Sequence, residues 1–279
     1  MTKMTLKEAT DILARSGVEF PEHDARELFI AFGGFSRSLP PRKNDSSDSP
    51  ELLSAIYRRK AREPLQYIIG ETAFCHETYR VTPAVLIPRE DTECLVLLAS
   101  KMLPRGARFL DLCTGSGCVG ISTLRASADT VCYAVDISPS AIEIAKENAK
   151  INGVEERFFT LVADLLETKT RDLLLGNAPY FAILANPPYI RDSLFKNLGP
   201  EVEAEPDCAL FGGVDGADFY RVLTPLYKSL IDKNGFIAYE IGFDQGDIIR
   251  QIAKDSGMRA EVHRDLSGND RVAILTCAD

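Results

Sequence analysis

RFLDLCTGSGCVGISTL, residues 108–124, places a short apolar run, a glycine-rich turn and a possible helix in direct succession. The run Arg108–Cys113 contains one carboxylate, Asp111, and the turn follows at residues 114–120. A strand, a glycine turn and a helix in this order are typical of a nucleotide-type pocket in an open α/β sheet. Glycines permit the tight turn and let a ligand approach the backbone closely. A glycine loop alone is weak evidence, so the neighbouring segments decide what the pocket holds.

Acidic residues follow the next two predicted strands. Val131–Val135 runs into Asp136, which lies 19 residues after Gly117, and an acid at this position can accept hydrogen bonds from ribose hydroxyls. Phe158–Val162 is followed by Ala163 and then by Asp164, whose carboxylate can reach an adenine amino group. The alternative is that each acid caps the following helix, and this alternative is stronger for Asp164 than for Asp136.

The sequence Asn186-Pro187-Pro188-Tyr189 follows an apolar run, residues 181–185, that predicts a fourth strand. Each proline fixes its own φ, removes a backbone donor and keeps the preceding residue out of the helical region. The Asn186 amide, the carbonyl oxygens and the Tyr189 ring are therefore held in a stiff, extended turn. Such a turn suits a planar group that carries an NH2, such as a carboxamide or the edge of a nucleobase. An ordinary proline-rich loop is the alternative.

Four successive strand ends thus carry a glycine loop, an acid, a second acid and Asn186–Tyr189. Ligands in open α/β sheets bind at the carboxyl ends of the strands, so the four segments converge on one cleft. This order resembles the S-adenosylmethionine-dependent methyltransferases of the Rossmann-like class. In that class, Asn-Pro-Pro-Tyr marks enzymes that methylate the glutamine amide nitrogen or the exocyclic amines of adenine and guanine. An NAD-binding site is a less favoured interpretation of the glycine loop. Residues 115–120 match GxGxxG, but no later segment resembles a nicotinamide site.

Further motifs, spread from about residue 60 to the C-terminus, resemble a single family. They are Pro64–Gly70, Phe74, Val85–Glu93, Asp111–Gly117, Glu205-Pro206, Ala209–Gly216, Glu240–Gly242 with Gln245, and Asp265 with Gly268–Arg271. This family is the HemK-type protein-(glutamine-N5) methyltransferases, which modify the glutamine of the Gly-Gly-Gln motif in peptide chain release factors. Two departures are visible: Cys113 stands where many relatives have glycine, and residues 176–181 lack an acid that often opens the fourth strand.

The resemblance implies S-adenosylmethionine as the cofactor and assigns roles around it. It implies that Thr114 and the loop glycines line the methionine side, that Asp136 holds the ribose, and that Asp164 with Leu165 borders the adenine. The expected cofactor-binding residues are Cys113, Thr114, Gly115, Ser116, Gly117, Asp136, Asp164, Leu165 and Asn186.

The expected chemistry starts from a poor nucleophile. The amide nitrogen lone pair is conjugated with the carbonyl, and the same resonance gives the rotation barrier of roughly 18–20 kcal/mol. We expect Asn186 Oδ1 and the Pro187 carbonyl to accept the two amide N–H groups, while Tyr189 stacks on the amide plane and excludes water. These three are the expected catalytic residues, and Pro188 joins them in the substrate-binding set. No strong general base is required, because an N-protonated amide is very acidic.

The composition is that of an ordinary soluble chain, with 45% hydrophobic and 26% charged residues. The net charge of −9 counts against a DNA or RNA substrate, and we interpret the basic run at residues 58–62 as the solvated end of a helix. There is no apolar run near 18 residues and no signal-peptide layout, so neither membrane nor export is indicated. Seven cysteines without a C-x-x-C pair suit reduced thiols in a cytoplasm, and no metal site is expected.

Pattern changes along the chain predict three parts. Residues 5–17, 21–33 and a segment from Pro50 read as helices, with a polar loop at 36–48, and form a small helical substrate-recognition domain at residues 1–72. Residues 73–94 read as an extended or hairpin linker. Residues 95–279 form the methyltransferase domain, a mostly parallel sheet that closes with an antiparallel hairpin of residues 259–264 and 271–277.

The sequence therefore predicts a cytoplasmic, S-adenosylmethionine-dependent glutamine-N5 methyltransferase whose partners are release factors. Its nearest alternative is the same reaction on a glutamine of a ribosomal protein, which shares the turn and the glycine loop. Methylation of a nucleobase amine is less favoured because of the charge. The non-enzymatic alternative is a cofactor-binding assembly factor without turnover, and the intact Asn186 and Tyr189 argue against it.

Overall fold

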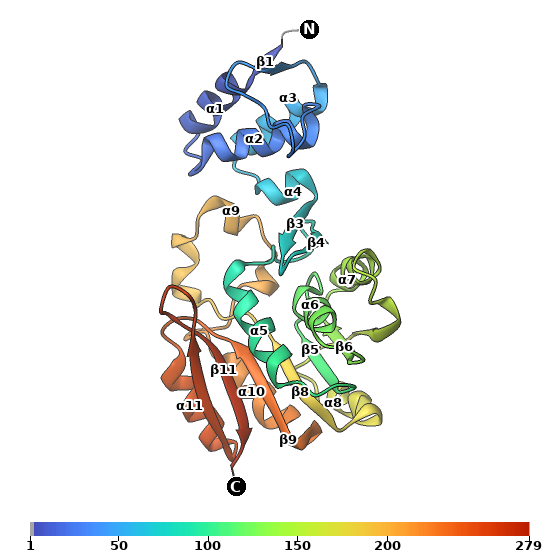
Figure 1. Cartoon of the computed structure of the whole chain (residues 1–279). Coiled ribbons are helices and arrows are strands. Elements are labelled where there is room, and N and C mark those ends of the chain that lie inside the picture. Colours follow the sequence, from blue (N-terminus) through green and yellow to red (C-terminus); the bar gives the residue numbers. More distant parts are fainter. Residues whose placement is uncertain (1–2, 279) are drawn as a thin grey trace. The chain divides into compact units, whose positions relative to one another are not determined.

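The computed structural model describes residues 3–278, apart from the side chains of residues 195–197 (Figure 1). The chain forms two compact units, described separately below. The first contains residues 1–71 and 199–204, and the second contains residues 72–198 and 205–279. Within residues 3–278, no helix is both long enough and apolar enough to cross a lipid bilayer.

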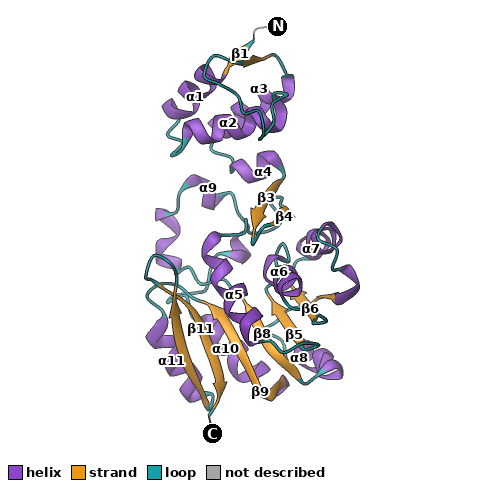
Figure 2. Cartoon of the chain, in the orientation of Figure 1, coloured by secondary structure: helices purple, strands orange, loops and turns teal. Residues whose placement is uncertain are grey.

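Helices make up most of the first unit (Figure 2). Thr5 begins the first of them, because its hydroxyl accepts a hydrogen bond from Glu8 N while the Glu8 carboxylate accepts one from Thr5 N. Ser49 begins the third by accepting a hydrogen bond from Leu52 N at 3.2 Å. The helices predicted at 5–17, 21–33 and from residue 50 are confirmed. The elements are β1 (Met4–Thr5), α1 (Leu6–Arg15), α2 (Pro21–Phe32), β2 (Ser46–Ser47), α3 (Pro50–Lys60), α4 (Leu65–Ile69) and α9 (Pro200–Glu203).

Ion pairs of the basic run at residues 58–62 stabilise this unit. Arg58 and Lys60 are exposed at the end of α3, as the interpretation of a solvated helix end requires, whereas Arg59 departs from it. Arg59 is only 6% exposed, and its Nε donates to Asp24 Oδ2 on α2 at 2.7 Å. Glu201 on α9 pairs with Arg59 Nη1 at 2.9 Å and with Arg62 Nε at 2.7 Å. The arginines lower the Glu201 pKa to about 2, against the opposing effect of burial. Segment 199–204 is therefore attached to the helical unit by charge.

The second unit is built on one seven-stranded sheet with the order β10-β11-β9-β8-β5-β6-β7. The pairs β7–β6, β6–β5, β5–β8 and β8–β9 are parallel, whereas β11 runs antiparallel to both β9 and β10. The prediction of a mostly parallel sheet with a C-terminal antiparallel hairpin is therefore confirmed. The strands are β5 (Arg108–Leu112), β6 (Val131–Asp136), β7 (Phe158–Val162), β8 (Tyr180–Ala185), β9 (Ile231–Glu240), β10 (Met258–Arg264) and β11 (Asp270–Cys277).

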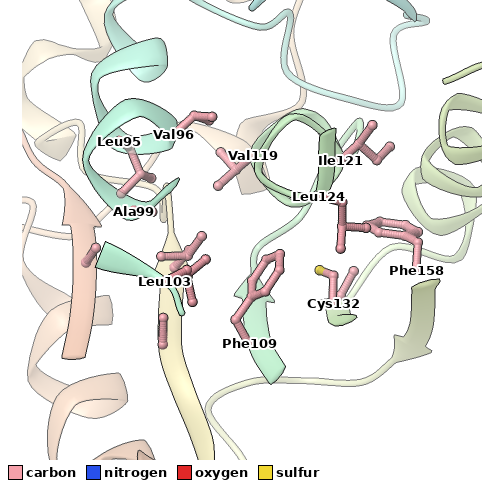
Figure 3. Packing of buried hydrophobic residues seen from close by; sticks show 14 of the residues in the cluster. Leu95, Val96, Ala99, Leu103, Phe109, Val119, Ile121, Leu124, Cys132 and Phe158 are labelled. Carbon is pink, nitrogen blue, oxygen red and sulfur yellow. The ribbon is translucent and has the colours of Figure 1, made fainter. Parts of the chain in front are cut away.

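Helices cover the sheet, because side chains along each strand alternate between two apolar clusters. On β5, Phe109 belongs to one cluster, which includes residues of α5, α6 and α7, whereas Leu110 belongs to the other, which includes residues of α8, α10 and α11. Figure 3 shows Phe109 and Cys132 of the sheet facing Val119 and Leu124 of α6 in the first cluster. The helices are α5 (Glu93–Met102), α6 (Cys118–Ala126), α7 (Pro139–Ile151), α8 (Thr168–Leu174), α10 (Asp218–Tyr227) and α11 (Gly246–Asp255), with short 3-10 segments at Glu90–Thr92 (η1), Glu155–Arg157, Leu175–Asn177, Asp192–Asn197, Asp207–Ala209 and Lys228–Leu230.

The pair β3 (Glu71–Phe74) and β4 (Glu77–Arg80) precedes this sheet in the chain. Phe74 and Tyr79 of this pair lie in the core cluster that contains α5, α6 and α7. Asn148 of α7 binds both backbone groups of Arg80 and also donates to Ser116 O at 2.8 Å. These contacts connect the hairpin to the glycine loop within the second unit. The predicted domain boundaries stay predictions.

The strand order positions the functional region. The chain runs outward from β5 to β6 and β7, and then returns to place β8 on the other side of β5. The loops that leave β5 and β8 therefore turn away from each other at the carboxyl edge of the sheet. In open α/β sheets, this switch point opens a crevice for ligands.

The sheet and α6 pack so closely at Gly120 that a side chain has no room there. A Cβ at this position meets Asp111 Oδ2 at 2.8 Å, Cys132 Sγ at 2.9 Å and Phe158 Cε2 at 3.0 Å. We expect Gly120→Ala to lower the free energy of unfolding by about 1–3 kcal/mol, although alanine is the better helix former. Urea unfolding measures this change. Gly176→Ala is the matched control, because its Cβ meets no atom within 4 Å, and equal stability of the two variants would contradict the packing described.

Candidate active site

A cavity of about 440 Å³ lies at the carboxyl edge of the sheet, where β5, β6, β7 and β8 end. All of its walls belong to the second unit. The lining residues are Ala84, Val85, Leu86, Pro88, Arg89, Thr92, Cys113, Thr114, Gly115, Ser116, Cys118, Val119, Asp136, Ile137, Ser138, Ala141, Asp164, Leu165, Leu166, Asn186, Pro188, Pro206, Asp207, Cys208, Ala209, Phe211 and Phe219.

Asp111 organises the glycine loop from inside the protein. Its side chain is buried, and Oδ2 accepts hydrogen bonds from Thr114 Oγ1 at 2.6 Å and from Gly120 N at 3.0 Å. Burial raises the pKa of Asp111 to about 7, against the opposing effect of these two hydrogen bonds. Both ends of the loop thus attach to one carboxylate that does not line the cavity, so Asp111 shapes the site from behind it.

Asp136, at the end of β6, attaches the loop from the opposite side. Its Oδ2 accepts a hydrogen bond from Gly115 N at 2.9 Å, and its Oδ1 accepts one from Ser138 N at 2.9 Å. Burial raises the pKa of Asp136, and the backbone donors oppose that shift. Gly115 has φ +54°, and no atom lies within 4 Å of the position that a Cβ would take there. A ligand in the cavity can therefore approach the backbone of this loop closely.

Asp164, after β7, both lines the cavity and stabilises its own turn. Its Oδ1 accepts a hydrogen bond from Leu166 N at 2.9 Å within the turn. It does not cap the following helix, because the N-cap residue of α8 is Glu167. Leu165 is buried beside it, and its carbonyl accepts a hydrogen bond from Tyr227 OH at 2.9 Å. The wall where adenine was expected thus combines one carboxylate with an apolar side chain.

The Asn186–Tyr189 turn leaves β8 on the other side of the crevice. Asn186 lines the cavity, and its Nδ2 donates to Thr92 Oγ1 at 3.3 Å. The Tyr189 hydroxyl donates a hydrogen bond to Glu240 Oε1 at 3.2 Å. Gln245 Nε2 donates to Tyr189 O at 3.1 Å. The turn is therefore supported from η1, from β9 and from the residue that precedes α11.

The predicted site residues divide into two groups. Among the described residues, three predicted positions do not line the cavity: Gly117, Pro187 and Tyr189. Gly117 is the N-cap residue of α6, Pro187 is buried, and the Tyr189 hydroxyl is bonded to Glu240. The predicted positions that line it are Cys113, Thr114, Gly115, Ser116, Asp136, Asp164, Leu165, Asn186 and Pro188.

The largest group of lining residues that the sequence did not indicate comes from residues 84–92. These residues precede α5 rather than follow a strand of the sheet, so the strand-end pattern does not reach them. The family motif at residues 85–93 was the available signal. A second wall, Pro206–Ala209, is fixed by the buried Glu205, which pairs with Arg89 Nη2 and accepts a hydrogen bond from Ile87 N at 3.2 Å.

Cys113, the departure from the family pattern, lies at the start of the glycine loop with φ +58°. Burial raises the pKa of its thiol well above the usual range, and the nearby Asp136 and Asp111 raise it further. The thiol therefore stays neutral and contributes a soft, weakly polar wall to the cavity. Within residues 3–278, no three His, Cys, Asp or Glu side chains are grouped so that they could hold a metal ion.

Comparison with known proteins agrees with this geometry. The family described as PrmC N-terminal domain matches residues 5–70, and that described as ribosomal protein L11 methyltransferase (PrmA) matches residues 91–194. A crystal structure of the ribosomal protein L11 methylase from Lactobacillus delbrueckii subsp. bulgaricus has a similar fold, with a TM-score of 0.52 and 20% identity over 72% of this chain and 85% of that one.

Closer relatives match nearly the whole chain. The release factor glutamine methyltransferase of Moorella thermoacetica is 37% identical over 96% of both chains. The protein of the same name from Geobacter sulfurreducens is 36% identical over 93% of this chain and 91% of its own. With this identity over this length, and with the glycine loop and the Asn186–Tyr189 turn at one crevice, the chain belongs to the release factor glutamine methyltransferase family.

Proposed function

We propose that this enzyme transfers a methyl group from S-adenosylmethionine to the side-chain amide nitrogen, N5, of the glutamine in the Gly-Gly-Gln motif of peptide chain release factors. One observation carries the proposal: Asn186 and the glycine loop line the same cavity, so an amide and a cofactor can meet there. The names of the relatives support the choice of substrate. The cytoplasmic location and the substrate-recognition role of residues 1–72 stay predictions.

The cavity fits S-adenosylmethionine in size and in chemistry. Its volume of about 440 Å³ lies in the range of ligand pockets. Asp136 offers carboxylate oxygens for ribose hydroxyls, and Asp164 and Leu165 offer an acceptor beside an apolar wall for adenine. The open backbone at Gly115 leaves room for the methionine part. When bound, S-adenosylmethionine supplies an electrophilic methyl group on a positively charged sulfur.

The Asn186–Tyr189 turn then acts on the amide. Asn186 Oδ1 and the Pro187 carbonyl accept the two N–H groups of the substrate amide and stabilise the positive charge that grows on its nitrogen. These acceptors need little reorganisation, because the two prolines restrict the backbone around them. Holding the amide nitrogen in line with the methyl group contributes about 7–11 kcal/mol to lowering the barrier.

Tyr189 contributes to this turn through its hydroxyl. The bond to Glu240 fixes one end of the side chain, and burial raises the pKa of Tyr189, so the phenol stays protonated and remains a donor. We retain the proposal that the ring face shields the amide from water, with its orientation set by Glu240. The proton of the methylated amide leaves without a strong base, because an N-protonated amide is very acidic.

Removing the Asn186 acceptor tests the mechanism. We expect Asn186→Ala to lower kcat by about 10²–10³-fold, because one preorganised polar group is lost from the transition state. The affinity for S-adenosylmethionine, measured by calorimetry, falls by a smaller factor. Asn234→Ala, which changes an exposed asparagine of β9, is the control and keeps wild-type activity. Near-wild-type turnover by Asn186→Ala would contradict the acceptor role.

Label transfer tests the substrate. Radiolabelled S-adenosylmethionine is offered with purified release factor, ribosomal proteins and RNA in parallel, and the labelled product is mapped by mass spectrometry. We expect label on the glutamine of Gly-Gly-Gln and none on a release factor in which that glutamine is replaced by glutamate. Label on a ribosomal protein alone keeps the chemistry and changes the substrate. Label on RNA contradicts the argument from the net charge of −9.

A further inference from the structure

Thr92 lies between the reacting turn and a buried carboxylate. It is 2% exposed, ends η1, and accepts a hydrogen bond from Asn186 Nδ2 at 3.3 Å. Glu240, the last residue of β9, is 1% exposed, and the Thr92 hydroxyl is one of the groups that stabilise its charged form. Three segments that are distant in the sequence thus meet at one hydroxyl.

The surroundings of Glu240 act on its charge in opposite directions. Burial raises its pKa, while Thr92, the Arg271 guanidinium and the Tyr189 hydroxyl oppose that shift. Tyr189 donates to Oε1, whereas Oε2 has no hydrogen-bond partner among the described residues. Arg271 also pairs with Asp91 at 3.0 Å and with Asp265 at 3.2 Å. A buried carboxylate oxygen without a partner is costly, so it is a strong acceptor for the nearby Thr92 proton.

The Thr92 hydroxyl does not cap a helix. Thr92 has the helical φ of −65° and ψ of −22°, because η1 continues directly into α5, and its side chain makes no capping hydrogen bond. The hydroxyl is therefore available to accept the hydrogen bond from Asn186 Nδ2.

The number of protons available decides which way the Asn186 amide faces. A threonine hydroxyl has one proton and two lone pairs, and a carboxylate only accepts. If the Thr92 proton goes to Glu240, only lone pairs face Asn186, so the amide must present its NH2 group to Thr92. The opposite orientation places Oδ1 against these lone pairs with no proton between them. Asn186 Oδ1 then remains for the cavity, and no other described residue donates a hydrogen bond to it.

We propose that Thr92 and Glu240 are positioning residues that fix the orientation of the Asn186 amide, and that they thereby select a substrate group that donates two N–H bonds. This inference rests on the proposed function. A glutamine amide nitrogen fits the acceptor Oδ1, whereas a glutamate carboxylate or a carbonyl oxygen presents lone pairs to it and is rejected. A flipped Asn186 reverses this preference.

A pair of Thr92 variants tests the proposal. Thr92→Val keeps the shape and removes the hydroxyl, and we expect kcat for methyl transfer to fall about 10- to 100-fold, because a buried amide loses its partner and its orientation. The KM for release factor and the Kd for S-adenosylmethionine change little. Thr92→Ser restores the hydroxyl and returns kcat to within about threefold of wild type. Thr224→Val, which removes a buried hydroxyl of α10 bonded to Tyr239, is the control with wild-type kcat.

Glu240→Gln is the second variant, because glutamine can donate to Thr92 and free the Thr92 proton to turn toward Asn186. We expect kcat to fall with little change in the Kd for S-adenosylmethionine. Wild-type kcat in Thr92→Val, or failure of Thr92→Ser to restore it, overturns the inference.

A readout without substrate separates this inference from the proposed function. In ¹⁵N-labelled enzyme, NMR follows the exchange of the Asn186 side-chain amide protons with water. We expect these protons to be protected in wild type and in Thr92→Ser, and to exchange faster in Thr92→Val. Equal exchange in all three contradicts the inference, whatever the enzyme methylates. Protection as expected, in an enzyme that does not methylate any release factor, contradicts only the proposed function.

Discussion

Parallel pairing of β8 with β5 is the constraint on which the site depends. Because parallel strands end at the same edge, this pairing places the glycine loop after Leu112 beside the turn after Ala185, although 73 residues separate these two positions. The register pairs Leu112 directly with Ala185, so the two loops leave the sheet at the same level. The reversal of strand order at this point opens the crevice between them. The sheet thereby brings together groups for a cofactor and groups for an amide.

Buried carboxylates then give each loop its shape. Asp111 holds the glycine loop through Thr114 and Gly120, and Glu240 holds the opposite turn through Tyr189. In each case the carboxyl oxygen accepts hydrogen bonds from its neighbours, so it determines the direction in which they donate. Burying it costs free energy, and the hydrogen bonds offset that cost only in one arrangement. A buried carboxyl group that accepts hydrogen bonds from a loop therefore lies on both sides of the crevice.

Much of this fold could be predicted from the sequence, because its signals are local. The apolar runs and the polar groups that follow them located β5, β6, β7 and β8. Elements without such a signal were missed, as α8 (Thr168–Leu174) shows. Within the basic run at residues 58–62, the burial of Arg59 was not foreseen, because its partners Asp24 and Glu201 lie far away in the sequence.

The candidate site was predicted only where its residues follow strands. Thr92 and Arg89 approach the cavity from the segment before α5, and neither strand periodicity nor residue spacing indicates that approach. The stacking role of the Tyr189 ring stays a prediction, but the hydrogen bond of its hydroxyl to Glu240, which lies 51 residues later in the chain, was not foreseen. Sequence spacing suggests which residues come close together, whereas the direction of a side chain depends on a partner that only the folded sheet brings near.

The measurement that tests the central claim most directly is a crystal structure with S-adenosylhomocysteine and a Gly-Gly-Gln peptide, at a resolution better than about 1.2 Å so that hydrogens can be assigned. The account predicts that Asn186 Oδ1 accepts a hydrogen bond from the glutamine amide nitrogen at about 2.7–3.2 Å, while the Asn186 NH2 group donates to Thr92. A glutamine whose amide oxygen faces the Asn186 NH2 group would contradict it.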